Sequence, residues 1–214
     1  MVEVQSHGFF FENWIRENFF EQYAGGYVQK WDIPQEFNRH KLVPTHLHDI
    51  EVSVKTAKYG SPIDLGDVLR QRMIERPFLM IVGFWRQRTP FEKWFEDIGW
   101  VKFTPAEWND LWGTLSLSQL LEIDKIVKDR SLHYSDVRQK AKAWKMNVAN
   151  ISGSQIVINP KIDSKVQRRV QCSIPFNVFW KSAGRSASQH DHPELFGFRF
   201  KNPHLSSART FNRG

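Results

Sequence analysis

The chain has 214 residues, of which 41% are hydrophobic and 14% aromatic, and a formal net charge of +7. This composition predicts a folded protein with a sizeable core and excludes wholesale disorder. The longest uniformly apolar run, residues 78–85, is too short to span a bilayer and predicts a buried strand. The single cysteine, Cys172, excludes an intramolecular disulfide and a zinc site built from several cysteines.

The positive charge is concentrated in the C-terminal part of the chain. Residues 151–214 contain four Lys and six Arg against two Asp and one Glu, so this segment carries the whole excess of +7. A basic segment with interleaved aromatic residues suits a polyanion, most simply nucleic acid, and the alternative is a solvated basic tail. We therefore expect a catalytic core with a helical insertion over 1–150 and a basic, DNA-contacting lobe over 151–214, within one domain.

Helical and strand periodicities alternate along the chain, which predicts an α/β or α+β fold with a mixed central sheet flanked by helices. Capping-box patterns at Thr104 and Ser116 predict two helix starts, and Ser135 is a candidate cap for another helix. In the first half of the chain we expect a helix at 9–20 ending before Gly25, a strand at 27–33, a turn at 38–44, a strand at 50–56, a helix at 63–75 and a strand at 78–85. In the second half we expect helices from 105, from 117 and over 136–146, followed by strands at 154–159 and 166–174. Beyond 181 we expect mostly loop.

The strand at 50–56 carries the most informative pattern. Glu51, Ser53 and Lys55 lie two apart, so they share one face, while Val52 and Val54 take the other and can enter a core. A strand that buries valines while presenting a carboxylate, a hydroxyl and an ammonium group resembles the floor of a site for metal-assisted chemistry on an anion.

An isolated aspartate, Asp32, lies about twenty residues upstream of this strand and could join it. Hydrolysis of a phosphodiester needs carboxylates to hold a divalent metal and a cation to offset charge in the transition state. Asp32 and Glu51 could supply the metal ligands, and hard oxygen ligands select Mg²⁺. Lys55 would then lie near the attacking water or the scissile phosphate.

The arrangement of Asp32 and Ser53-Val54-Lys55 resembles the PD-(D/E)xK nuclease signature, in the variant where serine replaces the middle acid. The resemblance covers roughly residues 8–90. It implies a restriction-endonuclease-like fold, with Glu12 as the glutamate of the first helix in a supporting metal or water role. Type II restriction enzymes that share this serine take their second acid from the following helix. Asp64 and Asp67 are therefore candidates beside Glu51, and Gln71 could face the same site.

The strand predicted at 166–174 is a candidate for base recognition. Lys165, Gln167, Arg169 and Gln171 are expected on one face, with Arg168 as an exception on the other, beside the buried Cys172. Arginine and glutamine side chains are the donors that read guanine and adenine edges in the major groove. Lys181, Arg185 and Arg199 would be phosphate contacts. The alternative is an edge strand with a charged outer face.

Together these patterns predict a sequence-specific, Mg²⁺-dependent type II restriction endonuclease that hydrolyses double-stranded DNA. A homodimer is expected because two copies can cut both strands of a two-fold symmetric site. With no signal peptide expected, the place of action would be the prokaryotic cytoplasm, in a restriction-modification system. The alternatives are a non-catalytic nucleic-acid-binding protein and a homing or repair nuclease with the same site.

Overall fold

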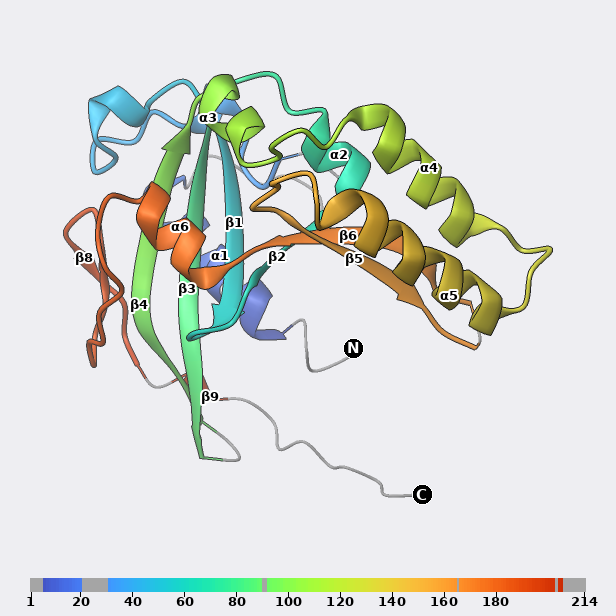
Figure 1. Ribbon diagram of the computed structural model, residues 1–214. Helices are drawn as coiled ribbons and strands as arrows, with labels where there is room; N and C mark the ends of the chain where they lie inside the picture. Colours follow the sequence, from blue (N-terminus) through green and yellow to red (C-terminus); the bar gives the residue numbers. More distant parts are fainter. Residues whose placement is uncertain (1–5, 21–30, 90–91, 165, 203, 206–214) are drawn as a thin grey trace. The chain divides into compact units, whose positions relative to one another are not determined.

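The computed structural model describes residues 6–20, 31–89, 92–164, 166–202 and 204–205 (Figure 1). These residues form a mixed α/β structure that divides into two compact units. Unit 1 comprises residues 1–61, 77–102 and 180–214, and unit 2 comprises residues 62–76 and 103–179. No helix within the described ranges is long and apolar enough to cross a membrane.

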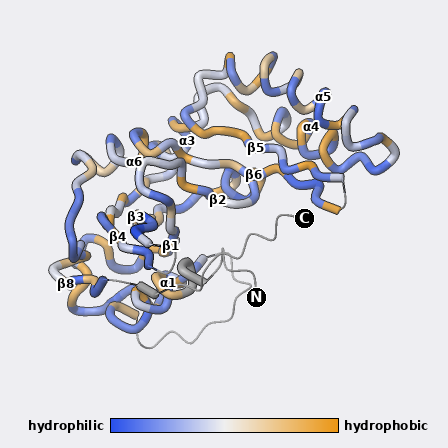
Figure 2. The backbone as a smooth tube through the Cα atoms, turned by 90° about the horizontal axis from the view of Figure 1, so that it is seen from below, coloured by the Kyte–Doolittle hydropathy of each residue, from blue (hydrophilic) through white to orange (hydrophobic). Residues whose placement is uncertain are grey.

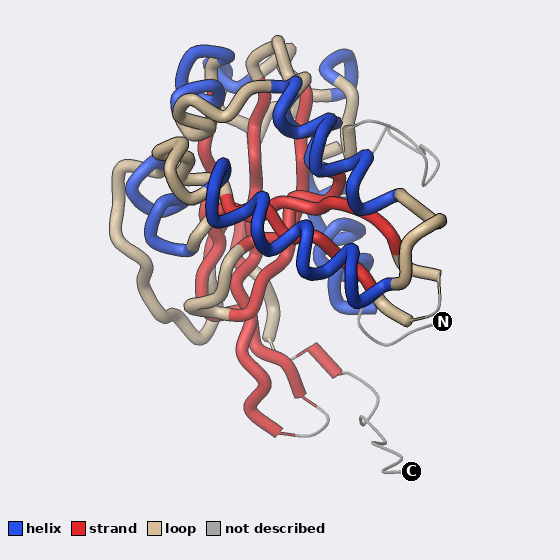
Figure 3. The backbone as a smooth tube through the Cα atoms, turned by 45° about the vertical axis from the view of Figure 1, so that its right-hand side comes forward, coloured by secondary structure: helices blue, strands red, loops and turns tan. Residues whose placement is uncertain are grey.

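Unit 1 is built on a sheet with the strand order β1-β3-β4-β9. β1 (Glu51–Lys58) and β3 (Phe78–Thr89) are parallel, with Glu51 opposite Phe78 and Lys58 opposite Trp85. β4 (Glu92–Phe103) pairs antiparallel with the short β9 (His204–Leu205), so the sheet is mixed. The strands predicted at 50–56 and 78–85 are confirmed. Figure 3 shows the long strands β3 and β4 running on past the end of β1.

α1 (Ser6–Phe19) packs its apolar face on this sheet. Phe11, Ile15 and Phe19 recur every four residues and are fully buried, as the helical period predicts. Phe11 stacks on Phe95 of β4, with ring centroids 5.0 Å apart. Gly83 of β3 lies under this stack, where an added Cβ would approach the Phe95 ring to 2.7 Å. α1 can therefore pack close to β3 because Gly83 has no side chain.

The remainder of unit 1 consists of short elements. η1 (Gln35–Phe37) and η2 (Thr45–Leu47) are single 3-10 turns in the loop before β1, where a turn was predicted. β7 (Glu194–Leu195) and β8 (Phe198–Arg199) form a small hairpin, within the segment predicted to be mostly loop. α1 ends at Phe19, close to the end of the helix predicted over 9–20, while Gly25 and most of the strand predicted at 27–33 lie outside the described residues.

β4 was not predicted, and its buried charges explain why. Lys93, Glu96 and Asp97 are each at most 3% exposed, so the strand lacks the alternation of polar and apolar residues that identifies a half-buried strand. Residues of β3 compensate the charges of Glu96 and Lys93, and Arg185 pairs with Asp97. Glu96 pairs with Arg86 and Arg88 of β3, and the Lys93 ammonium lies 4.8 Å from the centre of the Trp85 ring.

Unit 2 contains the antiparallel sheet β2-β6-β5 and the helices that cover one of its faces. β5 (Val157–Ile162) and β6 (Arg168–Ile174) pair antiparallel, and they overlap the strands predicted at 154–159 and 166–174. α4 (Leu117–Lys128) and α5 (Tyr134–Trp144) pack on them, and a π-helical turn, η3 (Lys145–Ala149), extends α5. Figure 2 shows hydrophobic positions recurring along β5, β6 and α4.

The helix starts in unit 2 follow the predicted capping boxes. Thr104 caps α3 (Pro105–Asp110) and Ser116 caps α4, each through reciprocal bonds with the third helical residue. At α5 the predicted cap is wrong, because the N-cap is His133, and the Ser135 hydroxyl contacts the His133 ring instead. α6 (Phe176–Ser182) follows β6 directly.

The helix predicted at 63–75 is wrong in its first half. Residues 63–67 form β2 (Ile63–Asp67), which pairs antiparallel with β6, and only the short α2 (Val68–Arg72) is helical. Gly66 explains the break: its φ of +84° lies in the left-handed region, where the pairing of β2 with β6 shifts register. Asp67 then caps α2 by accepting a hydrogen bond from the Arg70 amide at 2.9 Å.

Candidate active site

Asp32 is held beside β1 by main-chain hydrogen bonds. Ile33 forms an antiparallel bridge with Val52, in which Val52 N donates to Ile33 O at 2.9 Å and Ile33 N donates to Val52 O at 3.2 Å. The Asp32 amide donates to the same Val52 carbonyl at 3.1 Å. The Ile33 side chain is fully buried in the core under β1. These contacts fix the position of the Asp32 carboxylate.

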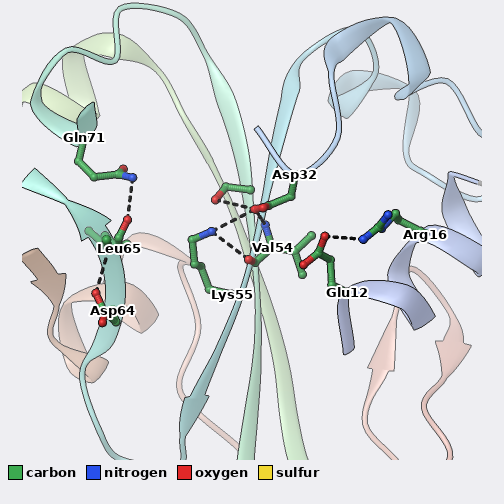
Figure 4. Close-up of polar contacts among 10 residues, drawn as sticks. Glu12, Arg16, Asp32, Val54, Lys55, Asp64, Leu65 and Gln71 are labelled. Carbon is green, nitrogen blue, oxygen red and sulfur yellow. Dashed lines mark hydrogen bonds and ion pairs between the residues drawn. The ribbon is translucent and has the colours of Figure 1, made fainter. Parts of the chain in front are cut away.

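The Asp32 carboxylate accepts three hydrogen bonds from consecutive residues of β1 (Figure 4). Its Oδ2 atom accepts from Ser53 Oγ at 3.3 Å, from Val54 N at 2.6 Å and from Lys55 Nζ at 3.0 Å. All three end on Oδ2, and no described residue donates a hydrogen bond to Oδ1. The structure therefore brings together Asp32, Ser53 and Lys55, as the sequence predicted, and leaves one carboxylate oxygen for another ligand.

Lys55 is a positioned, partly buried cation. Its ammonium group also donates to Val54 O at 3.0 Å, so two acceptors fix it. The side chains of Lys55 and Asp32 are 23% and 27% exposed. At this exposure the ion pair is shielded from bulk water more than a surface pair but can still be reached by a ligand. Val52 and Val54 enter the core on the opposite face, as predicted.

Glu12 on α1 lies within electrostatic reach of this pair. Burial raises the pKa of Glu12 above its ordinary value, and the Asp32 carboxylate raises that pKa further. Arg16, one turn along the helix, donates to Glu12 Oε1 at 2.7 Å, and the Arg16 and Lys55 cations lower the pKa in part. Two carboxylates and a lysine thus share one environment. Arg16 was not predicted, although the four-residue spacing from Glu12 is the signal that identifies such a pair.

The Glu51 carboxylate, expected on the same strand face as Ser53 and Lys55, is bound by a main-chain amide of η1. Its Oε2 atom accepts a hydrogen bond from the Gln35 amide at 3.0 Å, at the first residue of η1. The physical reason is that η1 follows Asp32 closely and presents an amide without a helical partner at the start of β1. The role of Glu51 as a metal ligand stays a prediction.

The rival acids belong to unit 2 and are not on a helix face as expected. Asp64 Oδ1 accepts from the Gly66 amide at 2.9 Å within β2, Asp67 caps α2, and Gln71 Nε2 donates to Leu65 O at 2.8 Å. These local bonds follow from the strand and cap that replace the predicted helix. Among the described residues no group of three or more His, Cys, Asp or Glu could hold a metal ion. A role for Asp67 in metal binding stays a prediction.

Two of the predicted DNA contacts are occupied by protein. Arg168 donates from Nη1 to Asp129 O at 2.9 Å and from Nη2 to Leu132 O at 3.2 Å, which joins β6 to the turn between α4 and α5. Arg185 donates to both carboxylate oxygens of Asp97, at 2.9 and 3.2 Å, and lies over the Trp180 ring. Sequence reasoning missed Asp97 because an acid inside an apolar strand gives no periodic signal.

The other predicted DNA contacts are differently placed. Arg169 and Lys181 are exposed, and Gln171 is half-buried on β6. The main-chain amide of Gln167 donates to Asp163 Oδ1 at 2.8 Å, at the connection between β5 and β6. Arg199 pairs with Glu194 on the β7–β8 hairpin. Lys165 lies outside the described residues.

The side chains of Asp32 and Lys55 are partly exposed. Two cavities of about 260 and 380 Å³ lie elsewhere in unit 1, around Phe37 and around Arg185, and neither is lined by Asp32 or Lys55. A partly exposed cluster of charged side chains can be reached by a polymer that lies across the surface.

The comparisons with known proteins leave the family open. No protein-family model matches the chain, and neither a curated protein nor a solved structure is significantly similar to it. The protein is therefore characterised by its geometry, a mixed α/β structure in which an aspartate, a serine and a lysine meet at one strand.

Proposed function

We propose that this protein is a Mg²⁺-dependent nuclease that hydrolyses phosphodiester bonds of double-stranded DNA, as a type II restriction endonuclease. The observation that carries the proposal is the convergence of Ser53, Val54 and Lys55 on Asp32 Oδ2. This places a carboxylate and an ammonium group side by side on a strand edge that a polymer can reach. The finer fold assignment, a restriction-endonuclease-like sheet, belongs to the same proposal.

The donor set at this site fits magnesium. Mg²⁺ prefers oxygen ligands and retains several waters, so one or two protein carboxylates are sufficient. Asp32 offers Oδ1, which accepts no hydrogen bond from a described residue, and Glu12 lies close enough for the Asp32 carboxylate to add to burial in raising the pKa of Glu12. A bound cation would offset the charge repulsion between Glu12 and Asp32. When bound, the metal would polarise the phosphate and lower the pKa of a coordinated water.

Lys55 is assigned to the phosphate. Its ammonium group is held by Asp32 and by Val54 O, so it is oriented before substrate arrives. A positioned cation stabilises the negative charge that builds on the phosphate oxygens during attack, and it needs little reorganisation to do so. Ser53 Oγ donates to Asp32, so its role is to orient the carboxylate. Glu51 is the candidate within unit 1 for a further acidic ligand.

The test is cleavage of long mixed-sequence DNA by the purified full chain, with Mg²⁺ or with EDTA, read on a gel. We expect discrete fragments with Mg²⁺ and intact DNA with EDTA. Asp32→Ala should abolish the fragments, whereas Lys58→Ala, which removes an exposed lysine from the same strand, should leave them unchanged. Intact DNA in every lane, accompanied by a mobility shift, would instead establish a non-catalytic nucleic-acid-binding protein.

The pattern of DNA fragments distinguishes a restriction enzyme from a homing or repair nuclease. Restriction enzymes read short sites strictly, so they give the same discrete bands from every preparation of one DNA. A homing nuclease would leave most DNAs uncut because its sites are long, and a repair nuclease would prefer damaged DNA. Equal activity with Mg²⁺ and EDTA would rule out the proposed metal dependence.

A further inference from the structure

A pair of like charges on the unit 2 sheet is the starting observation. Lys161 of β5 and Arg169 of β6 are directly opposite in the antiparallel register, and both are exposed. The Cβ atoms of directly opposite residues are about 4.5–5.5 Å apart, and like charges in such a pair are destabilising. No ion pair or hydrogen bond joins either side chain to another described residue. Within the described part of the chain, these two adjacent cations are therefore not compensated by an acidic group.

The neighbouring pair on the same face is made of amides. Asn159 lies opposite Gln171, two residues along from Lys161 and Arg169, so all four side chains project from one face of the hairpin. Asn159 Nδ2 donates to Ser173 Oγ at 2.9 Å, which fixes the orientation of that amide. We call these four residues, Asn159, Lys161, Arg169 and Gln171, the hairpin grid.

The other face of the hairpin is apolar and covered. Ile158, Val170 and Cys172 alternate with the grid residues and are at most 1% exposed. α4 and α5 pack on β5 and β6, and the helices provide buried partners such as Ile123 and Val137. The grid therefore has a rigid support, and its side chains are not needed to hold the sheet together.

We propose that the hairpin grid is a DNA-binding surface, in which Lys161 and Arg169 contact the phosphates of adjacent nucleotides and Gln171 faces the base edges. Two cations on neighbouring strands match the repeated negative charge of a nucleic-acid backbone. A two-stranded β-ribbon fits the major groove, where a glutamine amide can pair with adenine. The sequence pattern had indicated DNA contacts on β6 alone, and this inference adds the neighbouring residues of β5. It rests on the proposed function only in taking duplex DNA as the ligand.

Acidic groups near the grid define where the positive surface ends. Asp67 of β2 lies opposite Gln171 on the other side of β6. Asp163 lies two residues beyond Lys161, and its Oδ1 atom accepts a hydrogen bond from the Gln167 amide. These two acids flank the Lys161–Arg169 row, so the phosphate contact is assigned to Lys161 and Arg169.

The experiment measures the affinity of the full chain for a short fluorescein-labelled DNA duplex by fluorescence anisotropy, in EDTA and over a series of salt concentrations. The double variant Lys161→Ala/Arg169→Ala should bind about tenfold more weakly at moderate salt and lower the salt slope by about two, one for each phosphate contact. The matched control is Lys125→Ala/Lys142→Ala, which removes two exposed lysines from α4 and α5. An equal loss in this control would overturn the proposal, since net charge alone would explain both.

A charge reversal separates binding from folding. Lys161→Glu would create an opposite-charge pair with Arg169, so the melting temperature should stay the same or rise by about 1–2 °C while DNA affinity falls. A fall in both would assign the pair a structural role and overturn the proposal. Competition by poly-glutamate as effective as competition by unlabelled duplex would overturn the assignment of DNA as the partner.

Failure of this inference and failure of the proposed function give different results. The binding measurements are made without Mg²⁺ and are repeated in the Asp32→Ala variant, in which no cleavage is expected. If the grid variants lose affinity but the parent protein cuts no DNA, the surface stands and the nuclease proposal fails. If the parent cuts DNA but the grid variants bind normally, the nuclease stands and the surface is elsewhere.

Discussion

Two strand lysines in this protein have opposite surroundings. Lys55 of β1 is half-buried, and its ammonium group donates to the Asp32 carboxylate at 3.0 Å. Lys161 of β5 is exposed and lies opposite Arg169, with no carboxylate partner in the described part of the chain. A cation that is fixed by a carboxylate is suited to act at one atom of a substrate. A cation left beside another cation is suited to bind an anion that the protein itself does not supply.

The strongest test of this contrast removes the carboxylate of the paired lysine. Asp32→Asn keeps the shape of the side chain but removes its charge, so DNA cleavage with Mg²⁺ should fall by about 10³-fold. DNA binding in EDTA should change little, because the grid residues are untouched. Initial rates on a defined plasmid, with anisotropy as the binding control, check both. Cleavage within a few-fold of the parent would remove Asp32 from the chemistry.

The second test compares two lysines of one strand. Lys55→Ala should lower the cleavage rate by about 10²-fold, because it removes the cation aimed at the substrate, whereas Lys58→Ala at the exposed end of β1 should have little effect. The same plasmid assay applies, with circular dichroism confirming that both variants fold. Similar losses in the two variants would indicate a general charge effect rather than a positioned group.

The third test compares adjacent arginines of β6. Arg168→Ala should lower the free energy of unfolding by about 1–2 kcal/mol, because the Asp129 and Leu132 carbonyls lose their donors. Arg169→Ala should change it by less than about 0.5 kcal/mol and weaken DNA binding instead. Urea unfolding measures the first effect and anisotropy the second. If the two effects were exchanged, the structural and binding roles would have to be reassigned.

The smallest expected effect concerns the pH dependence of stability. Because the folded protein raises the pKa of Glu12, mainly through burial, the folded state binds this proton more tightly than the unfolded chain does. Stability should therefore fall as the pH rises from about the ordinary pKa of 4.5 through the raised folded value. Glu12→Gln should remove this fall and be slightly more stable near neutral pH, by less than about 1 kcal/mol.

Magnesium provides the control for the Glu12 prediction. If Mg²⁺ binds beside Glu12 and Asp32, it should raise the melting temperature of the parent protein at neutral pH, because a ligand that binds only the folded state stabilises it. The rise should be smaller in Glu12→Gln and absent in Asp32→Asn. An equal rise in all three proteins would place the bound metal somewhere else.

Several elements of the fold were predictable from the sequence because their determinants are local. α1 shows its helical period in Phe11, Ile15 and Phe19, and the capping boxes at Thr104 and Ser116 mark the starts of α3 and α4. The alternation along β1 and β6 correctly separated the core face from the polar face. Such signals need only neighbouring residues, so they survive without knowledge of the rest of the structure.

The elements that were mispredicted depend on distant partners. β4 carries Glu96 and Asp97 inside the core, which is possible only because Arg86 and Arg185 reach them from other segments. β2 is a strand because it pairs with β6, although its composition also suits a helix. In both cases pairing with a remote segment outweighs the local preference, and a single sequence does not show which segments will meet.

The candidate site shows the same division. The sequence by itself determined that Asp32, Ser53 and Lys55 are the residues to consider, since their chemistry and spacing are visible in it. Only the tertiary structure decided that Ser53 and Lys55 donate to one carboxylate oxygen of Asp32, while Glu51 accepts from η1 and Arg168 and Arg185 bind protein groups. The physical reason is that a charged side chain bonds to whichever partner folding brings within reach, and that partner can be any distance away along the chain.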